Sequence, residues 1–95
     1  PVKLTILPLI KKLHSEKARE IYAELSSEFT CQLDEAGSIG KRYRRSDAIG
    51  TPYCITIDDE TINNGTVTLR DRDTMEQITL KLDEVKNYIN NKIKF

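Results

Sequence analysis

The chain has 95 residues, of which 38% are hydrophobic and 32% are charged, and its 15 basic and 15 acidic side chains cancel. This length and composition are typical of one folded domain and exclude a disordered or low-complexity chain. A net charge of zero excludes the long-range attraction to polyanions of a strongly basic domain, so any nucleic-acid binding must come from local patches. The longest apolar stretch near the N-terminus, residues 4–10, is interrupted by Thr5 and Pro8 and is shorter than the ~20 residues of a membrane span.

The cysteine and histidine content bounds the compartment and the metal chemistry. Cys31 and Cys54 lie alone, without CxxC spacing or clustered histidines, and no signal-peptide core is present. We therefore expect a reducing, intracellular compartment. His14 is the only histidine, so a zinc site would need carboxylate ligands, which is an uncommon solution. The chain opens on Pro1 without a methionine, which favours a domain excised from a longer protein.

The first third of the chain predicts a strand, a helix and a second strand. Residues 2–9 (VKLTILPL) are apolar and largely without alternation, which is typical of a strand buried on both faces. Ser15 is a candidate N-cap for a helix. The apolar face of that helix comprises Ala18, Ile21, Tyr22 and Leu25. Residues 29–33 (FTCQL) complete a strand–helix–strand unit, whose two strands run parallel.

A second helix is expected over residues 39–49, with Ser38 as its N-cap and Pro52 beyond its end. It carries four cations within five residues, which we expect to face solvent: Lys41, Arg42, Arg44 and Arg45. Two interpretations of this run stay open, a solvated helix face and a patch that contacts phosphates beside the interleaved Tyr43.

The second half of the chain predicts three more strands and a helix. Residues 53–57 (YCITI) predict a strand, and the turn Asn63-Asn64-Gly65 predicts a hairpin into a strand over 66–72. In that strand Arg70 and Arg72 share one face and point the same way, toward solvent or a ligand. Residues 75–82 predict a fifth strand.

A final helix, with Asp83 as its N-cap, has Val85, Tyr88, Ile89 and Ile93 on one face. The element order is therefore β-α-β-α-β-β-β-α. This order predicts an α/β domain with a mixed five-stranded sheet and helices on its faces.

Catalytic chemistry is not indicated. His14 beside Ser15 favours a solvated loop histidine over a catalytic base, and both cysteines fall in strands, where a thiol packs as a small hydrophobe. The glycines lack the order of a phosphate-binding loop. The acidic run 58–60 is interpreted as a solvated turn or as a recognition or metal site.

The grouping of Glu60 with Arg70 and Arg72 across one hairpin leaves two interpretations open. Single-stranded bases are read by carboxylates that accept from amino groups and by arginines that donate to ring acceptors. Ordinary cross-strand salt bridges explain the same residues, and an ion pair to Asp47 or Asp71 is a further structural interpretation.

Two long patterns carry a resemblance. Residues 37–58 (GSIGKRYRRSDAIGTPYCITID) and 66–77 (TVTLRDRDTMEQ) resemble the C-terminal anticodon-binding domain of glycyl-tRNA synthetases, which are class II enzymes. The opening LTILPL fits the same domain, so the resemblance spans essentially the whole chain, residues 1–95.

The resemblance implies a three-layer α/β/α anticodon-binding fold that recognises the anticodon stem-loop of glycine tRNA. It implies that Glu60 and Arg70 read the two cytosines of the anticodon and that Arg72 contacts a base or phosphate. As possible contacts to the RNA backbone it implies Lys41, Arg42, Arg44 and Arg45. It implies no catalytic residue, metal or DNA partner in this chain.

The same resemblance implies a parent protein. Catalysis with ATP and Mg²⁺ belongs to a catalytic domain of the same chain, in a cytoplasmic or organellar enzyme that forms a homodimer. The alternative function is a structural or protein-interaction domain, because anticodon-binding folds are also reused as accessory subunits.

Overall fold

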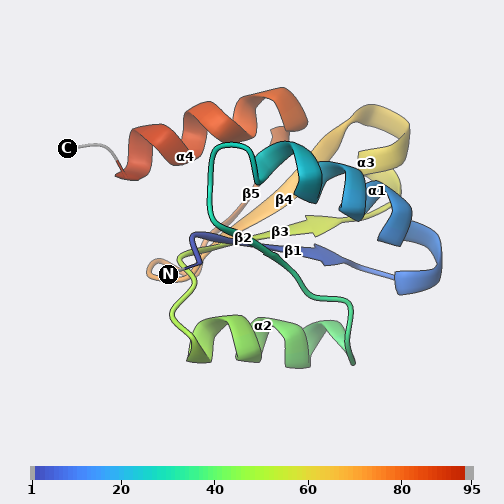
Figure 1. Ribbon diagram of the computed structural model, residues 1–95, viewed down its shortest axis with the longest axis horizontal. Coiled ribbons are helices and arrows are strands. Elements are labelled where there is room, and N and C mark those ends of the chain that lie inside the picture. The colour runs from blue at the N-terminus through green and yellow to red at the C-terminus, as the bar shows by residue number, and fades with distance from the viewer. Residues whose placement is uncertain (1, 94–95) are drawn as a thin grey trace.

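The computed structural model describes residues 2–93, except for the side chain of Ile93 (Figure 1). Pro1 and the predicted inward face of Ile93 lie outside the described residues. The elements in chain order are β1 (Leu4–Pro8), α1 (Lys11–Leu25), β2 (Cys31–Leu33), α2 (Ile39–Ala48), β3 (Tyr53–Ile57), α3 (Asp59–Asn64), β4 (Thr66–Asp71), β5 (Gln77–Lys81), η1 (Leu82–Glu84) and α4 (Val85–Ile93). None of these helices is long and apolar enough to cross a membrane.

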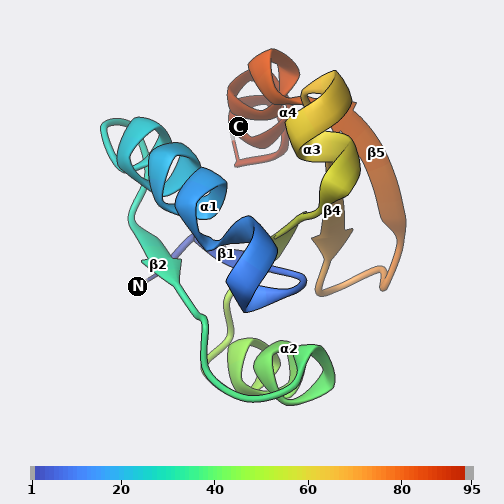
Figure 2. The same cartoon turned by 90° about the vertical axis from the view of Figure 1, so that its right-hand side faces the viewer.

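The five strands form one mixed sheet in the order β2-β1-β3-β4-β5. β1 runs parallel to β2 and β3, whereas β4 runs antiparallel to β3 and β5. Helices α1, α3 and α4 lie on one face of the sheet, and α2 lies on the other face (Figures 1 and 2). The predicted three-layer α/β/α fold is confirmed, including its parallel first half.

The apolar core lies between the sheet and helices α1 and α4. Alternate strand residues point into it, and the predicted inward face of α1 is confirmed. The buried core residues include Leu4, Ile6, Ala18, Ile21, Leu25, Ile55, Ile57, Val67, Leu69, Val85 and Ile89. Because successive strand side chains point to opposite faces, the residues between them lie on the α2 side. That side is polar, and it positions the candidate site.

The start of α1 differs from the prediction. The helix begins at Lys11 after the N-cap Ile10, so Ser15 lies inside it. Residue 14 explains the difference, because His14 is 1% exposed and its Nδ1 accepts from the Ile10 N–H at 3.0 Å. Its Nε2 donates to Asp59 Oδ1 at 2.8 Å. The prediction of a solvated loop histidine is wrong, since this ring ties α1 to α3.

The sequence prediction lacked α3. Asp58 caps the helix by accepting from the Thr61 N–H at 3.2 Å, while the Thr61 hydroxyl accepts from the Asp58 N–H at 3.1 Å. Gly65 ends the helix in the left-handed region, at φ 71°, which glycine adopts without strain. The acidic run 58–60 is therefore the start of a helix, and the connection between β3 and β4 is not a tight turn.

Several element ends are shorter or shifted. β1 spans Leu4–Pro8, β2 spans Cys31–Leu33 and β5 spans Gln77–Lys81, each inside its predicted range. Asp83 lies within η1 and not at an N-cap. Glu84 caps the start of η1, because its Oε1 accepts from the N–H of the N-cap residue Lys81 at 3.0 Å.

Candidate nucleic-acid interface

Helix α2 packs on the polar face of the sheet through hydrogen bonds. The Ser46 hydroxyl lies 3.1 Å from Thr5 Oγ1 and 3.2 Å from the Cys54 thiol. The Tyr43 hydroxyl bonds the Thr56 hydroxyl. These contacts fix the rotation of α2 about its axis, because polar groups pair only in defined geometries. Burial raises the pKa of the Cys54 thiol, in keeping with the predicted core role.

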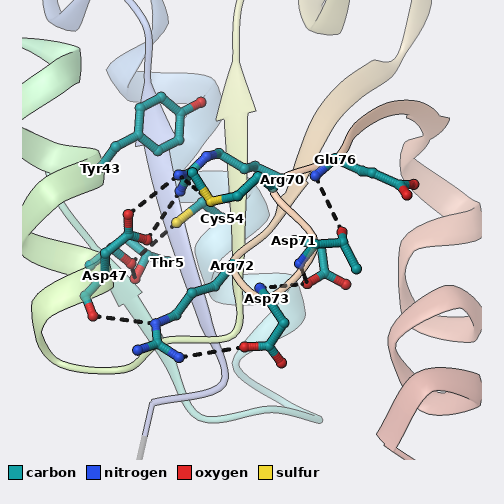
Figure 3. A network of polar contacts seen from close by, with 12 residues as sticks. Thr5, Tyr43, Asp47, Cys54, Arg70, Asp71, Arg72, Asp73 and Glu76 are labelled. Atoms are coloured by element: carbon teal, nitrogen blue, oxygen red, sulfur yellow. Dashed lines mark hydrogen bonds and ion pairs between the residues drawn. The ribbon is translucent and has the colours of Figure 1, made fainter.

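Arg70 lies between α2 and the β4–β5 loop and is 9% exposed (Figure 3). Its Nη1 and Nη2 donate to the two carboxylate oxygens of Asp47 at 3.1 and 3.3 Å. The guanidinium carbon lies 5.1 Å from the centre of the Tyr43 ring, close enough for a cation–π interaction. The hydrogen bonds that Arg70 donates to Asp47 raise the pKa of Arg70. The predicted ion pair with Asp47 is confirmed, and the guanidinium does not project freely into solvent.

Arg72 directly follows β4 and approaches the same end of α2. Its Nε donates to the Asp47 carbonyl at 3.3 Å, and its Nη1 lies 3.5 Å from Asp73 Oδ1 (Figure 3). The prediction that Arg70 and Arg72 point the same way is confirmed. The Arg72 side chain is 43% exposed, so it is the more accessible of the two arginines.

Glu60 lies at the other end of the strands. Arg70 pairs with Cys54 at the start of β3, whereas Glu60 follows the end of β3 in the first turn of α3. The register places the two ends ~10 Å apart along the strand direction alone. Glu60 is exposed, and its Oε2 accepts from the Asn64 side chain at 2.5 Å. The predicted grouping of Glu60 with Arg70 and Arg72 across one hairpin is therefore wrong.

Arg42 is a buried structural residue. It is 3% exposed, and its guanidinium donates to the carbonyls of Gly37 at 3.2 Å, of Asp34 at 3.4 Å and of Pro8. The prediction that it faces solvent is wrong. Arg42 lies four residues before Ser46 and therefore on the same face of α2, the face that contacts the sheet.

Arg45 is exposed but paired. Its Nε and Nη2 donate to Asp34 at 3.0 and 2.8 Å, and Nη2 also donates to the Ala36 carbonyl at 2.6 Å. Burial opposes ionisation of Asp34, but the hydrogen bonds from Arg45 and the Ala36 N–H, together with the nearby positive charge, hold its pKa below the usual range. Lys41 and Arg44 are exposed, and within residues 2–93 no carboxylate forms an ion pair with either.

Strands β4 and β5 carry polar side chains on the α2 side. We call this surface the β4–β5 polar strip. It comprises the cross-strand pairs Thr66–Lys81 and Thr68–Thr79, together with Gln77 opposite Arg70. Gln77, Thr79 and Lys81 are exposed, and among the described helices only α2 lies on this side, over β1 and β3 (Figure 2). The alternation that produces the strip is visible in the sequence, but it did not single out these residues as functional.

Comparison with known proteins places the chain in a family. The family described as "Anticodon binding domain" matches residues 3–92. The chain belongs to the anticodon-binding domain family. Over its full length it is 61% identical to a glycine–tRNA ligase of Clostridium kluyveri and 55% identical to one of Bacillus cereus, covering 20% of each. The resemblance inferred from the sequence is thus confirmed.

A solved structure supports the fold. The RNA binding domain of threonyl-tRNA synthetase from Cryptosporidium parvum Iowa II superposes with a TM-score of 0.87 at 28% identity, covering 96% of this chain and 23% of that one. The chain spans about a fifth of the length of the curated glycine–tRNA ligases it matches. Within residues 2–93 no three His, Cys, Asp or Glu residues gather as metal ligands.

Proposed function

We propose that the chain binds the anticodon stem-loop of glycine tRNA, as one domain of a glycine–tRNA ligase. Membership of the anticodon-binding domain family and full-length similarity to ligases of that name support this function. The observation that carries it is the β4–β5 polar strip, an uncovered sheet surface with arginines at one end. Glu60 lies past the other end of the strands, in helix α3 on the opposite face of the sheet (Figure 2). Open sheet surfaces beside cationic side chains are suited to single-stranded RNA.

The site chemistry matches cytosine, the second and third letter of glycine anticodons. Cytosine offers an N4 amino donor for a carboxylate such as Glu60, and N3 and O2 acceptors for a guanidinium such as Arg70. Because Glu60 and Arg70 lie at opposite ends of the strands, we assign them to different bases. Arg72, which is more exposed, contacts a base or a phosphate beside Arg70.

The backbone contacts are assigned to the exposed cations of α2. Lys41 and Arg44 have no carboxylate partner in the described part of the chain, so their charges are available to phosphates. The guanidinium of Arg42 donates its hydrogen bonds to backbone carbonyls. We therefore assign Arg42 to holding α2 in place. Arg45 is shared between Asp34 and solvent, and it adds a weaker phosphate contact.

The remaining ligase functions belong to the rest of the parent protein. We propose that a catalytic domain of the same chain binds ATP and Mg²⁺ and that the parent is a cytoplasmic homodimer. Similarity to bacterial glycine–tRNA ligases, of which the chain covers 20%, supports a ligase as the parent. No step of aminoacylation is assigned to residues of this chain.

Filter binding of the 95-residue chain to two RNAs tests the function. A glycine anticodon stem-loop is expected to bind more tightly than the same stem-loop with both cytosines replaced. Arg72→Ala should weaken glycine stem-loop binding ~10-fold, since a good base contact contributes ~1–3 kcal/mol in nucleic-acid readout. Lys12→Ala, which removes the same charge from α1 on the far face, is the control and should bind like wild type. Equal binding of the two RNAs refutes anticodon recognition and favours an accessory interaction domain.

A further inference from the structure

Arg70 presents a conflict between its assigned role and its surroundings. It is 9% exposed, its Nη1 and Nη2 both donate to Asp47, and Tyr43 lies beside it. The remaining contact is at Nη2, which lies 3.3 Å from Met75 Sδ. A base acceptor can therefore reach this donor only by taking the place of the thioether.

Met75 itself occupies an unusual backbone conformation. Its φ is 64°, and it is the only residue other than glycine with a positive φ within residues 2–93. The Met75 N–H donates to the Asp71 carbonyl at 2.8 Å, and the Asp71 carboxylate accepts from the N–H groups of Asp73 and Thr74 at 2.9 and 3.2 Å. The turn thus holds residue 75 in the left-handed region, where glycine and asparagine are favoured.

A methionine at such a position is explained by its side chain, because its backbone is disfavoured there. Residues held in sparsely populated conformations gather where function requires them. Met75 is 61% exposed, so it contributes little to the core. Its side chain accepts a hydrogen bond from the Arg70 guanidinium at Sδ.

The chemistry of that contact suits a temporary partner. A thioether is a weak acceptor, whereas a base carbonyl or ring nitrogen is a strong one. A carboxylate or amide oxygen at position 75 would hold the Arg70 donor firmly and would have to be displaced. The Asp47 carboxylate, by contrast, forms two charge-assisted bonds and stays in place.

We propose that Met75 is a gate on Arg70. Its thioether covers Nη2 in the free protein and gives this donor up to an acceptor of an anticodon base, while Asp47 and Tyr43 keep the guanidinium in position. This inference rests on the proposed function. It assigns a positioning role to a side chain of the β4–β5 loop that lies between Arg70 and solvent.

Two variants of similar size separate the gate from ordinary packing. Met75→Gln replaces the weak acceptor by an amide oxygen, and Met75→Leu removes the acceptor while keeping an apolar side chain. Binding of the glycine stem-loop to the 95-residue chain should weaken ~5-fold in Met75→Gln and stay within ~2-fold of wild type, or strengthen, in Met75→Leu. Both variants keep the positive φ, but only Met75→Gln adds a hydrogen bond to Arg70 in the free protein, so it should melt ~4–8 °C above Met75→Leu. Met75→Gly, which relieves the conformation and removes the cover, should melt higher and bind no more weakly than wild type.

The outcomes distinguish the role of Met75 from the proposed anticodon recognition. If wild type prefers the glycine stem-loop but Met75→Gln binds as Met75→Leu does, the gate is wrong and the proposed function stands. Equal weakening by Gln and Leu also overturns the gate, because Met75 itself would then contact the RNA. If wild type shows no preference between the two stem-loops, anticodon recognition fails and the gate fails with it.

Discussion

Removing the Asp47 carboxylate tests whether a buried ion pair holds Arg70. Asp47→Ala keeps the backbone carbonyl used by Arg72 but deprives Arg70 of contacts at 3.1 and 3.3 Å. Removing one partner of a fully buried pair destabilises a protein by ~3–5 kcal/mol, because the remaining charge is uncompensated. Arg70 is 9% exposed, but the Asp47 side chain is 35% exposed. Water therefore screens part of the pair, and we expect a smaller loss of ~2 kcal/mol.

Urea denaturation of the 95-residue chain measures this loss, which corresponds to a melting temperature lower by ~8–16 °C in a domain of this size. Asp73→Ala is the matched control. It removes a carboxylate that is 80% exposed and 3.5 Å from Arg72, and surface pairs of this kind contribute ~0–1 kcal/mol. In an Arg70→Met background Asp47→Ala should be nearly neutral, since the pair no longer exists. Equal unfolding midpoints for Asp47→Ala and Asp73→Ala would refute the reasoning.

Two further predictions concern buried polar groups that join elements. His14→Leu removes the acceptor for the Ile10 N–H and the donor to Asp59, so urea denaturation should show a loss of ~1–2 kcal/mol. Asp59→Ala should lose less, because that carboxylate is 75% exposed, and equal losses would contradict the assigned role of His14. Asp34→Asn removes a carboxylate whose pKa is lowered in the folded state, so its stabilisation is present above about pH 4 and is lost as the pH falls through the folded pKa. The variant should therefore be less stable than wild type near neutral pH, with a gap that closes in acid, and a pH-independent gap would contradict this.

Local patterns in the sequence were sufficient for most of the fold. Apolar residues at helical spacing predicted the buried face of α1, and alternation predicted which residues of β4 point into the core. The signal for α3 was also present, with Asp58 at the N-cap, Thr61 three residues later and Gly65 at the end. It was overridden by the turn propensity of Asn63-Asn64-Gly65, which fits a hairpin and a helix end equally well.

The polar contacts could not be predicted in the same way. His14 is buried because Asp59, 45 residues away, accepts the hydrogen bond from its Nε2–H. Arg42 is buried because the carbonyls of Pro8 and Asp34 converge on it. Such partners come together only in the folded chain, so local charge and spacing favoured solvent for both side chains.

These long-range contacts also change the electrostatics of RNA binding. The basic run of α2 presents four cations in the sequence, but Arg42 is buried and Arg45 is paired with Asp34. In the proposed function Lys41 and Arg44 then carry most of the phosphate attraction, in a chain whose net charge is zero. So few phosphate contacts supply little of the sequence-independent affinity that basic RNA-binding proteins use. We therefore propose that discrimination rests on hydrogen bonds to bases at the β4–β5 polar strip. For that purpose a guanidinium held in advance by Asp47 loses less entropy on binding than a mobile one.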